Sequence, residues 1–82
     1  MLGGRNEILK GMDIIRIGEQ IYILRKRKGI TQKELALELG ITTQAVSKWE
    51  NARSCPDIQM LPDLAKVFNV SIDELFGCEH IS

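Results

Sequence analysis

The sequence has 82 residues, of which 11 are basic and 11 are acidic, so its formal net charge is zero. A chain of this length suits one small domain with a single hydrophobic core and excludes a second core. No apolar run approaches the roughly 18 residues that a membrane span requires, and the first residues lack a signal-peptide pattern, so we expect a cytoplasmic protein without a membrane segment.

Residues 1–15 begin with the stretch MLGGRNEILKG, which contains two adjacent glycines. One interpretation is an extension upstream of a start at Met12. The other is a short amphipathic arm that packs on the domain or on a second copy of it. The apolar face of such an arm consists of Ile8, Leu9, Met12 and Ile15. The sequence leaves both interpretations open.

The first predicted helix covers residues 16–28. Its apolar positions, Ile17, Ile21 and Leu24, recur at intervals of four and three, which is the spacing of an amphipathic helix. Gly29 follows directly and predicts the end of this helix, because glycine readily adopts the conformations that terminate helices.

A capping box marks the start of the second predicted helix. Thr31 is followed three residues later by Glu34, so that each side chain can accept a hydrogen bond from the other residue's backbone N–H. Ile30 and Leu35 flank the box as a hydrophobic staple. Gly40 supplies the left-handed conformation that ends a helix, so the chain must turn there.

A third predicted helix begins almost at once, with Thr42 as its N-cap, and covers residues 43–51. Ile41 and Val46 form its hydrophobic staple. Because only about three residues separate it from the second helix, the two helices must cross steeply. Ala36 is small at the position where we expect the second helix to come closest to the third.

The outward side of the third predicted helix carries groups that suit a binding surface. Its residues are Thr43, Gln44, Ser47 and Lys48. Such side chains hydrogen-bond to base edges and phosphates, and few of them would serve a core. A helix of a generic bundle would instead expose mostly Glu and Lys pairs. The pattern therefore favours a surface that binds nucleic acid.

Residues 52–56 form a predicted loop, and a fourth helix over residues 58–68 follows with Asp57 as its N-cap. Pro62 lies one turn inside this helix and cannot donate its N–H. Either the first turn is 3₁₀-like, or the regular helix begins near Leu61. The core-facing residues of this helix are Leu61, Leu64, Ala65 and Phe68.

A second capping box predicts a fifth, short helix, because Ser71 is followed three residues later by Glu74. Val70 and Leu75 form the matching staple. We expect this helix to end at Gly77.

The chain from about Ile17 to Phe76 resembles the phage-repressor/Cro-like helix-turn-helix family, also called the XRE family. The matching residues are Gln32, Glu34, Leu35, Ala36, Gly40, Thr42, Gln44, Val46, the run from Ser47 to Asn51, and the run from Pro56 to Ile58. About ten positions with different physical requirements agree at once, so the resemblance is specific. It implies an all-α, compact, five-helix lambda-repressor-like domain over residues 16–77, whose second and third helices form the helix-turn-helix. Residues 1–15 are then an arm or extension, and residues 78–82 a tail.

The resemblance also assigns structural roles. In the family, an arginine at the position of Arg25 pairs with a glutamate at the position of Glu50. We therefore expect a partly buried ion pair that ties the first helix to the third and serves to position them. Family members usually have glycine where this chain has Ala52, so Asn51 is an alternative site for the left-handed turn after the third helix.

The charges are unevenly distributed along the chain, although they sum to zero. Residues 25–53 hold seven basic and three acidic side chains, whereas residues 54–82 hold one basic and five acidic side chains. We therefore expect a polarised molecule, with positive potential on the half that carries the third helix. Binding to DNA should be weaker and more salt-sensitive than for a strongly basic protein.

The resemblance implies a sequence-specific regulator of transcription that binds double-stranded DNA, and we expect a repressor. The expected base contacts in the major groove are Thr43, Gln44, Ser47 and Lys48. The expected phosphate contacts are Gln32, through its side chain or its backbone N–H, together with Thr42, Asn51 and Arg53. One such helix covers only a few base pairs, so we expect a homodimer on a palindromic operator, with the fifth helix or the N-terminal arm at its contact.

No combination of side chains in the sequence supports catalysis. There is a single histidine, His80, no glycine-rich phosphate loop and no pair of carboxylates with acid/base spacing. Cys55 and Cys78 lack metal-site spacing, so we expect free thiols, no metal and no cofactor. Two alternatives to a simple regulator stay open. One is an antitoxin-type DNA-binding protein that also masks a protein partner, and the other is a protein-interaction module that has lost DNA binding.

Overall fold

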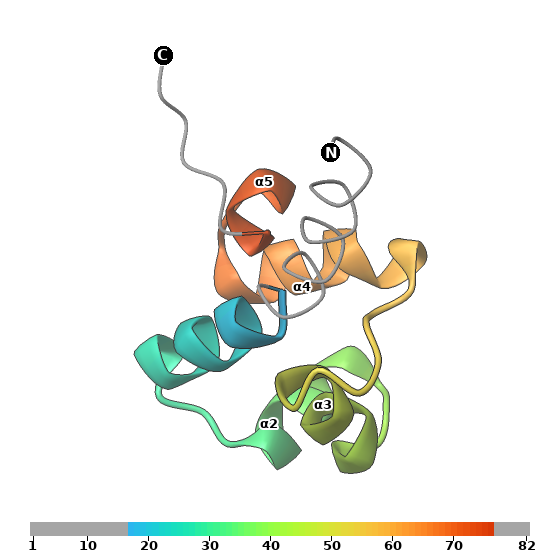
Figure 1. Ribbon diagram of the computed structural model, residues 1–82. Coiled ribbons are helices and arrows are strands. Elements are labelled where there is room, and N and C mark those ends of the chain that lie inside the picture. The colour runs from blue at the N-terminus through green and yellow to red at the C-terminus, as the bar shows by residue number, and fades with distance from the viewer. Residues whose placement is uncertain (1–16, 77–82) are drawn as a thin grey trace, which may run out of the picture.

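The computed structural model describes residues 17–76, which form helices joined by short segments (Figure 1). Within this range the first helix spans residues 17–28. It is followed by α2 (Gln32–Leu39), α3 (Thr43–Glu50), a 3₁₀ helix η1 (Ile58–Met60), α4 (Leu61–Phe68) and α5 (Ile72–Leu75). No strand occurs among residues 17–76, so the predicted five-helix, all-α fold is confirmed. The expectations for residues 1–15, Gly77 and residues 78–82 lie outside the described residues.

Every one of the five helices contributes to a single core. In Figure 1, α4 and α5 lie above the first helix, and α2 and α3 lie below it. The buried core residues are Ile17, Ile21, Leu24, Leu35, Ala36, Val46, Trp49, Leu64 and Leu75. The predicted apolar face of the first helix is therefore confirmed. None of the helices described here is both long and apolar enough to cross a membrane.

Both predicted capping boxes are present. In the first, Thr31 Oγ1 accepts a hydrogen bond from the Glu34 N–H at 3.0 Å, and Glu34 Oε1 accepts one from the Thr31 N–H at 2.8 Å. Ser71 and Glu74 make the equivalent pair of bonds at 3.1 and 2.8 Å. Gly40 ends α2 in the left-handed conformation, with a φ of 72°. These local bonds fix where α2 and α5 begin and where α2 ends.

The start of α4 differs from the expected cap. Asp57 occupies the N-cap position of η1, but its side chain makes no capping hydrogen bond, so its predicted capping role is wrong. The chain forms one 3₁₀ turn, Ile58–Met60, and the regular helix begins at Leu61 with Pro62 in its first turn. A proline needs no N–H partner there, which explains the delayed start. The helix closes at Asn69, whose φ of 57° gives a left-handed cap that was not predicted.

The left-handed residue after α3 is Ala52, with a φ of 58°. The alternative placement at Asn51 is wrong, because that residue has a φ of −98°. The Ala52 N–H donates to the Trp49 carbonyl at 3.1 Å, and the Arg53 N–H donates to the Lys48 carbonyl at 2.9 Å. These bonds satisfy two of the last carbonyls of α3, and they require the turn one residue beyond Asn51.

Candidate nucleic-acid interface

The turn between α2 and α3 is held by backbone and capping hydrogen bonds. The Ile41 N–H donates to the Ala36 carbonyl at 3.0 Å, and Thr42 Oγ1 accepts a hydrogen bond from the Ala45 N–H at 3.1 Å. Ala36 is buried where α2 packs on the rest of the core. The second helix of the pair therefore starts at a defined point relative to the first.

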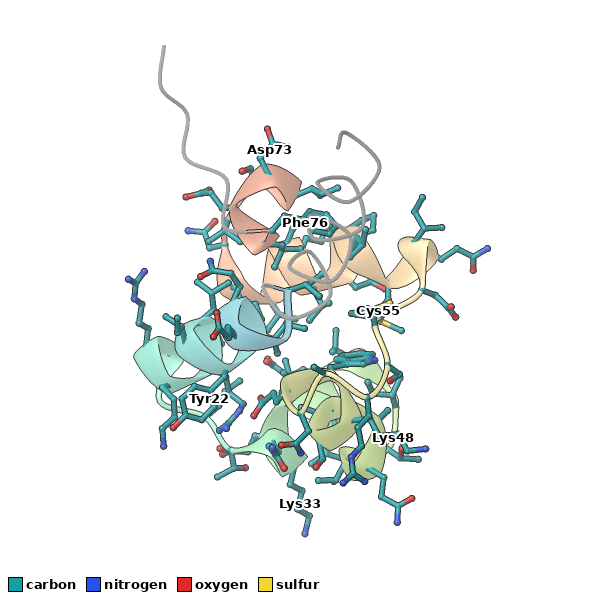
Figure 2. The ribbon with its side chains drawn as sticks, in the orientation of Figure 1. Tyr22, Lys33, Lys48, Cys55, Asp73 and Phe76 are labelled. Carbon is teal, nitrogen blue, oxygen red and sulfur yellow. The ribbon has the colours of Figure 1, made fainter. Side chains whose placement is uncertain are left out.

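One side of α3 faces the core and the other faces solvent. Thr43, Gln44 and Lys48 are exposed, and Ser47 is half-buried. Figure 2 shows Lys48 projecting on the same side of the molecule as Lys33 of α2, away from α5. The structure thus brings the four residues expected to contact bases onto one helix, with three of them open to solvent.

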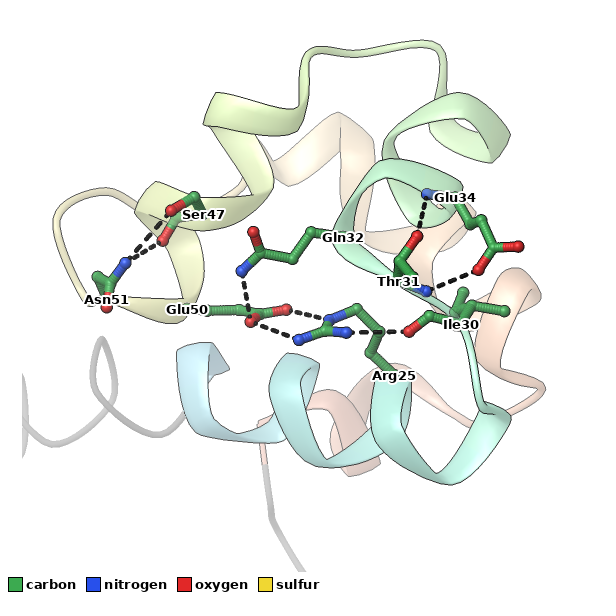
Figure 3. Close-up of polar contacts among 8 residues, drawn as sticks. All are labelled: Arg25, Ile30, Thr31, Gln32, Glu34, Ser47, Glu50 and Asn51. Carbon is green, nitrogen blue, oxygen red and sulfur yellow. Dashed lines mark hydrogen bonds and ion pairs between the residues drawn. The ribbon is translucent and has the colours of Figure 1, made fainter.

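Arg25 and Glu50 form a bidentate ion pair between the first helix and the end of α3 (Figure 3). Arg25 Nε donates to Glu50 Oε2 at 2.7 Å and Arg25 Nη2 donates to Glu50 Oε1 at 3.1 Å. The two side chains are only 9% and 5% exposed. The hydrogen bond to Glu50 raises the pKa of Arg25 above its ordinary value, although burial acts in the opposite direction. The expected tie between the first and third helices is therefore in place.

Two further hydrogen bonds extend this ion pair into a network that includes the start of α2. Arg25 Nη1 donates to the Ile30 carbonyl at 2.9 Å. Gln32 Nε2 donates to Glu50 Oε1 at 2.9 Å, so the Gln32 side chain turns toward α3 (Figure 3). The backbone N–H of Gln32, at the first position of α2, is thus better placed to bind a phosphate than the side-chain amide of Gln32.

The other three residues expected to contact phosphates lie around α3. Thr42 and Arg53 are exposed. Asn51 is also exposed, but its Nδ2 donates to the Ser47 carbonyl at 2.9 Å and to Ser47 Oγ at 3.3 Å. The amide of Asn51 therefore folds back on α3, and of these three side chains Arg53 carries the positive charge.

An open hollow lies between the end of the first helix and the start of α2. It is lined by Arg25, Lys26 and residues 29–33. Lys26 and Lys33 are exposed and place positive charge at this hollow. The N-terminus of a helix flanked by basic side chains suits an anion such as a phosphate.

Two features of the site were not predicted from the sequence. Gly18 is buried, and a Cβ at this position would overlap the Trp49 carbonyl oxygen. The sequence does carry a signal for this contact, because Gly18 lies inside a helical pattern. Glycine lowers helix stability there, so its presence suggests a packing reason. Tyr22 is half-exposed, with the Arg25 guanidinium carbon 5.4 Å and Lys26 Nζ 5.7 Å from its ring centre. The ring therefore holds two cations near the basic hollow.

Across residues 17–76, no group of three or more His, Cys, Asp or Glu side chains is placed to hold a metal ion. Cys55 is an exposed free thiol.

Comparison with known proteins identifies related sequences over most of the chain. A family model described as Helix-turn-helix matches residues 21–75. The HTH-type transcriptional activator BcrR of Enterococcus faecalis is 36% identical over 67 residues, which cover 82% of this chain and 33% of that protein. The chain thus spans about a third of the length of this relative. The HTH-type transcriptional regulator YazB of Bacillus subtilis is 38% identical over 58 residues, which cover 71% of this chain and 84% of that protein.

Comparison of the fold identifies a related crystal structure, that of the P22 c2 repressor in complex with a synthetic operator. The two structures agree with a TM-score of 0.68 at 34% sequence identity. The match covers 72% of this chain and 89% of the repressor chain.

Proposed function

This chain belongs to the helix-turn-helix family, and on that premise we propose that it regulates transcription by binding specific sequences of double-stranded DNA. The observation that carries the proposal is the exposed polar side of α3, with Thr43, Gln44 and Lys48, beside the basic hollow at the start of α2. Such a surface offers hydrogen-bonding groups to base edges and positive charge to phosphates. The operator complex of the related P22 c2 repressor supports the same function.

The contacts divide by what they recognise. Thr43 and Gln44 lie in the first turn of α3, which enters the major groove, and Lys48 lies one turn further on the same side. Gln44 makes the bidentate contact that selects adenine, and Lys48 reaches guanine O6 and N7 or a phosphate. Ser47, between them, contributes a hydroxyl to a base edge or to a bridging water.

The phosphate contacts hold α3 in the groove from both sides. The backbone N–H of Gln32 meets a phosphate at the positive end of α2, next to Lys33. Thr42, Asn51 and Arg53 meet phosphates on the side of α3. The excess of basic residues in the segment 25–53 supports this placement, because it concentrates positive charge around both helices.

The DNA-bound form in this proposal is a homodimer on a palindromic operator. A single α3 covers only a few base pairs, so useful specificity needs two half-sites about one helical turn apart. The subunit contact lies at α5, where Ile72 is partly exposed, or at the N-terminal arm. Repression is the proposed outcome, in keeping with the P22 c2 relative, and the proposed place of action is the cytoplasm.

The direct test is a selection from a pool of random DNA duplexes with the purified chain. The expected result is enrichment of a palindromic site, with two subunits per duplex in equilibrium sedimentation. A pool that shows no enrichment contradicts the proposal and favours a protein-interaction module. One subunit per duplex at saturation removes the dimer. A reporter gene that the chain switches on through the selected site contradicts repression.

A further inference from the structure

The hydrogen bond between Gln32 and Glu50 joins the first residue of α2 to the last residue of α3. Gln32 Nε2 lies 2.9 Å from Glu50 Oε1, and the same oxygen accepts a hydrogen bond from Arg25 Nη2 at 3.1 Å. The Glu50 side chain is only 5% exposed, so its hydrogen bonds are made largely away from water. Hydrogen bonds to a charged group in such a setting are stronger than those between neutral groups.

We propose that Gln32 is a positioning residue for α3, which acts through Glu50 and not through a side-chain contact with DNA. The bond fixes the start of α2 relative to the end of α3. A phosphate held at the start of α2 then sets the depth and register of α3 in the major groove. This inference rests on the proposed DNA-binding function.

The other polar contacts in the helix pair do not provide this link. Thr31 and Glu34 bond to each other at the start of α2, and Thr42 bonds to Ala45 at the start of α3. Each of these bonds fixes the end of one helix alone. Arg25 ties Glu50 to the first helix and to the Ile30 carbonyl, one residue before the α2 cap. Among the described residues, the amide of Gln32 is the side-chain donor that joins the two helices directly.

A direct phosphate contact by the Gln32 amide predicts a different behaviour. The amide would have to leave Glu50, whose Oε1 would keep Arg25 as its partner. Phosphate contacts carry no sequence information, so losing one weakens binding to all duplexes alike. Losing a positioning contact weakens the base contacts, so it reduces affinity for the preferred site more than for other duplexes.

The test is a comparison of Gln32→Met with Lys33→Met in the full chain. The first change removes the amide donor and keeps the length of the side chain, while the second removes a neighbouring exposed cation. Affinity is measured on the selected duplex and on a scrambled one at several salt concentrations, well below the unfolding temperature. Gln32→Met should lower the ratio of the two affinities by about three- to tenfold, which lies within the range of coupling between residues in one hydrogen-bond network. Its salt dependence should stay that of the parent.

The control Lys33→Met should weaken both duplexes alike and reduce the salt slope by about one unit. A Gln32→Lys variant keeps a donor within reach of Glu50, so it should restore the ratio of affinities even though the added charge raises both. A double variant with Gln44→Ala should lose less discrimination than the two single losses multiplied together, because both act on the same base contacts.

The possible outcomes separate this inference from the function on which it rests. A parent chain that does not discriminate between the two duplexes overturns both. A discriminating parent whose Gln32→Met variant loses equal affinity on both duplexes, or loses none, overturns the positioning role alone. If circular dichroism shows that Gln32→Met is unfolded, the Gln32→Lys variant becomes the deciding test. A fall in the affinity ratio of Gln32→Lys then equally overturns the role.

Discussion

Gly18 of the first helix lies against the carbonyl oxygen of Trp49, so that a Cβ at residue 18 would overlap this oxygen. The two backbones meet there without an intervening side chain. About two turns further along the first helix, Arg25 reaches Glu50, the residue after Trp49. The same stretch of α3 is thus held by a steric contact and by an ion pair, and both depend on how closely the first helix approaches.

The first prediction concerns this close approach. Gly18→Ala should destabilise the domain by about 1–3 kcal/mol, because the new methyl group can fit only if the backbone of the first helix or of α3 moves. Urea denaturation measures the change in the free energy of unfolding. Glu19→Ala is the control, since residue 19 is exposed and should change stability by less than about 0.5 kcal/mol. An equally stable Gly18→Ala variant would show that the two helices are not in backbone contact.

The second prediction concerns the strained turn after α3. Ala52 is left-handed, which costs a residue with a Cβ roughly 1–2 kcal/mol. Ala52→Gly should therefore stabilise the domain by about 0.5–1 kcal/mol, after the greater freedom of glycine in the unfolded chain is taken into account. Thermal unfolding checks it. Asn51→Gly is the matched control, because its φ needs no glycine and the change removes two bonds to Ser47. Stabilisation by the control but not by Ala52→Gly would contradict the assigned turn.

The third prediction concerns the turn between α2 and α3. Gly40→Val should cost about 1–3 kcal/mol, because a β-branched residue is forced into left-handed geometry. The space around a Cβ at this position is open, so the cost comes from the backbone and not from a clash. Gly40→Asn should cost less, because asparagine tolerates this conformation. If the valine variant unfolds at the same temperature as the parent, Gly40 is not the turn residue.

How much of this structure could be predicted from sequence depends on how far apart along the chain the interacting residues lie. The capping box of Thr31 and Glu34 involves residues three apart, so the sequence alone specifies it. The close approach at Gly18 and the bond from Gln32 to Glu50 join residues that meet only after the helices pack. Residue propensity favours a left-handed turn at Asn51 over one at Ala52. The turn nevertheless lies at Ala52, because the last carbonyls of α3 need hydrogen-bond partners. Tertiary contacts thus outweigh local preference at these points.

The fourth prediction concerns the buried ion pair. Glu50→Ala should destabilise the domain by about 3–5 kcal/mol, because it leaves the guanidinium of Arg25 buried without its carboxylate. The double change Arg25→Met with Glu50→Leu should cost less, since no charge is then left unpaired. Denaturant unfolding of Arg25→Met alone, Glu50→Leu alone and the double variant, each compared with the parent, gives the coupling free energy. A double variant that is less stable than Glu50→Ala would contradict this account.

The contribution of this ion pair to stability depends on pH through the ionisation of Arg25. The pKa of Arg25 is raised by its hydrogen bond to Glu50, so its contribution to stability is fully present below the pKa of the unfolded chain. It is lost only as the pH rises through the raised pKa, far above neutrality. Titration of Arg25 should therefore leave stability unchanged between about pH 6 and pH 9.

The last prediction separates residues that recognise bases from residues that hold phosphates. Gln44 is exposed in the first turn of α3, so Gln44→Ala should lose about 1–3 kcal/mol on the selected duplex and relax the preference at one base pair.

Arg53 is exposed in the loop after α3, so Arg53→Ala should weaken all duplexes alike and lower the salt slope by about one unit. Titrations of both variants against the selected and a scrambled duplex, at several salt concentrations, distinguish the two roles. Gln44→Ala should leave the salt slope unchanged, because a neutral side chain releases no counterions. Equal losses for Gln44→Ala on both duplexes would mean that α3 does not recognise bases, and the protein-interaction module would then be the better account of this surface.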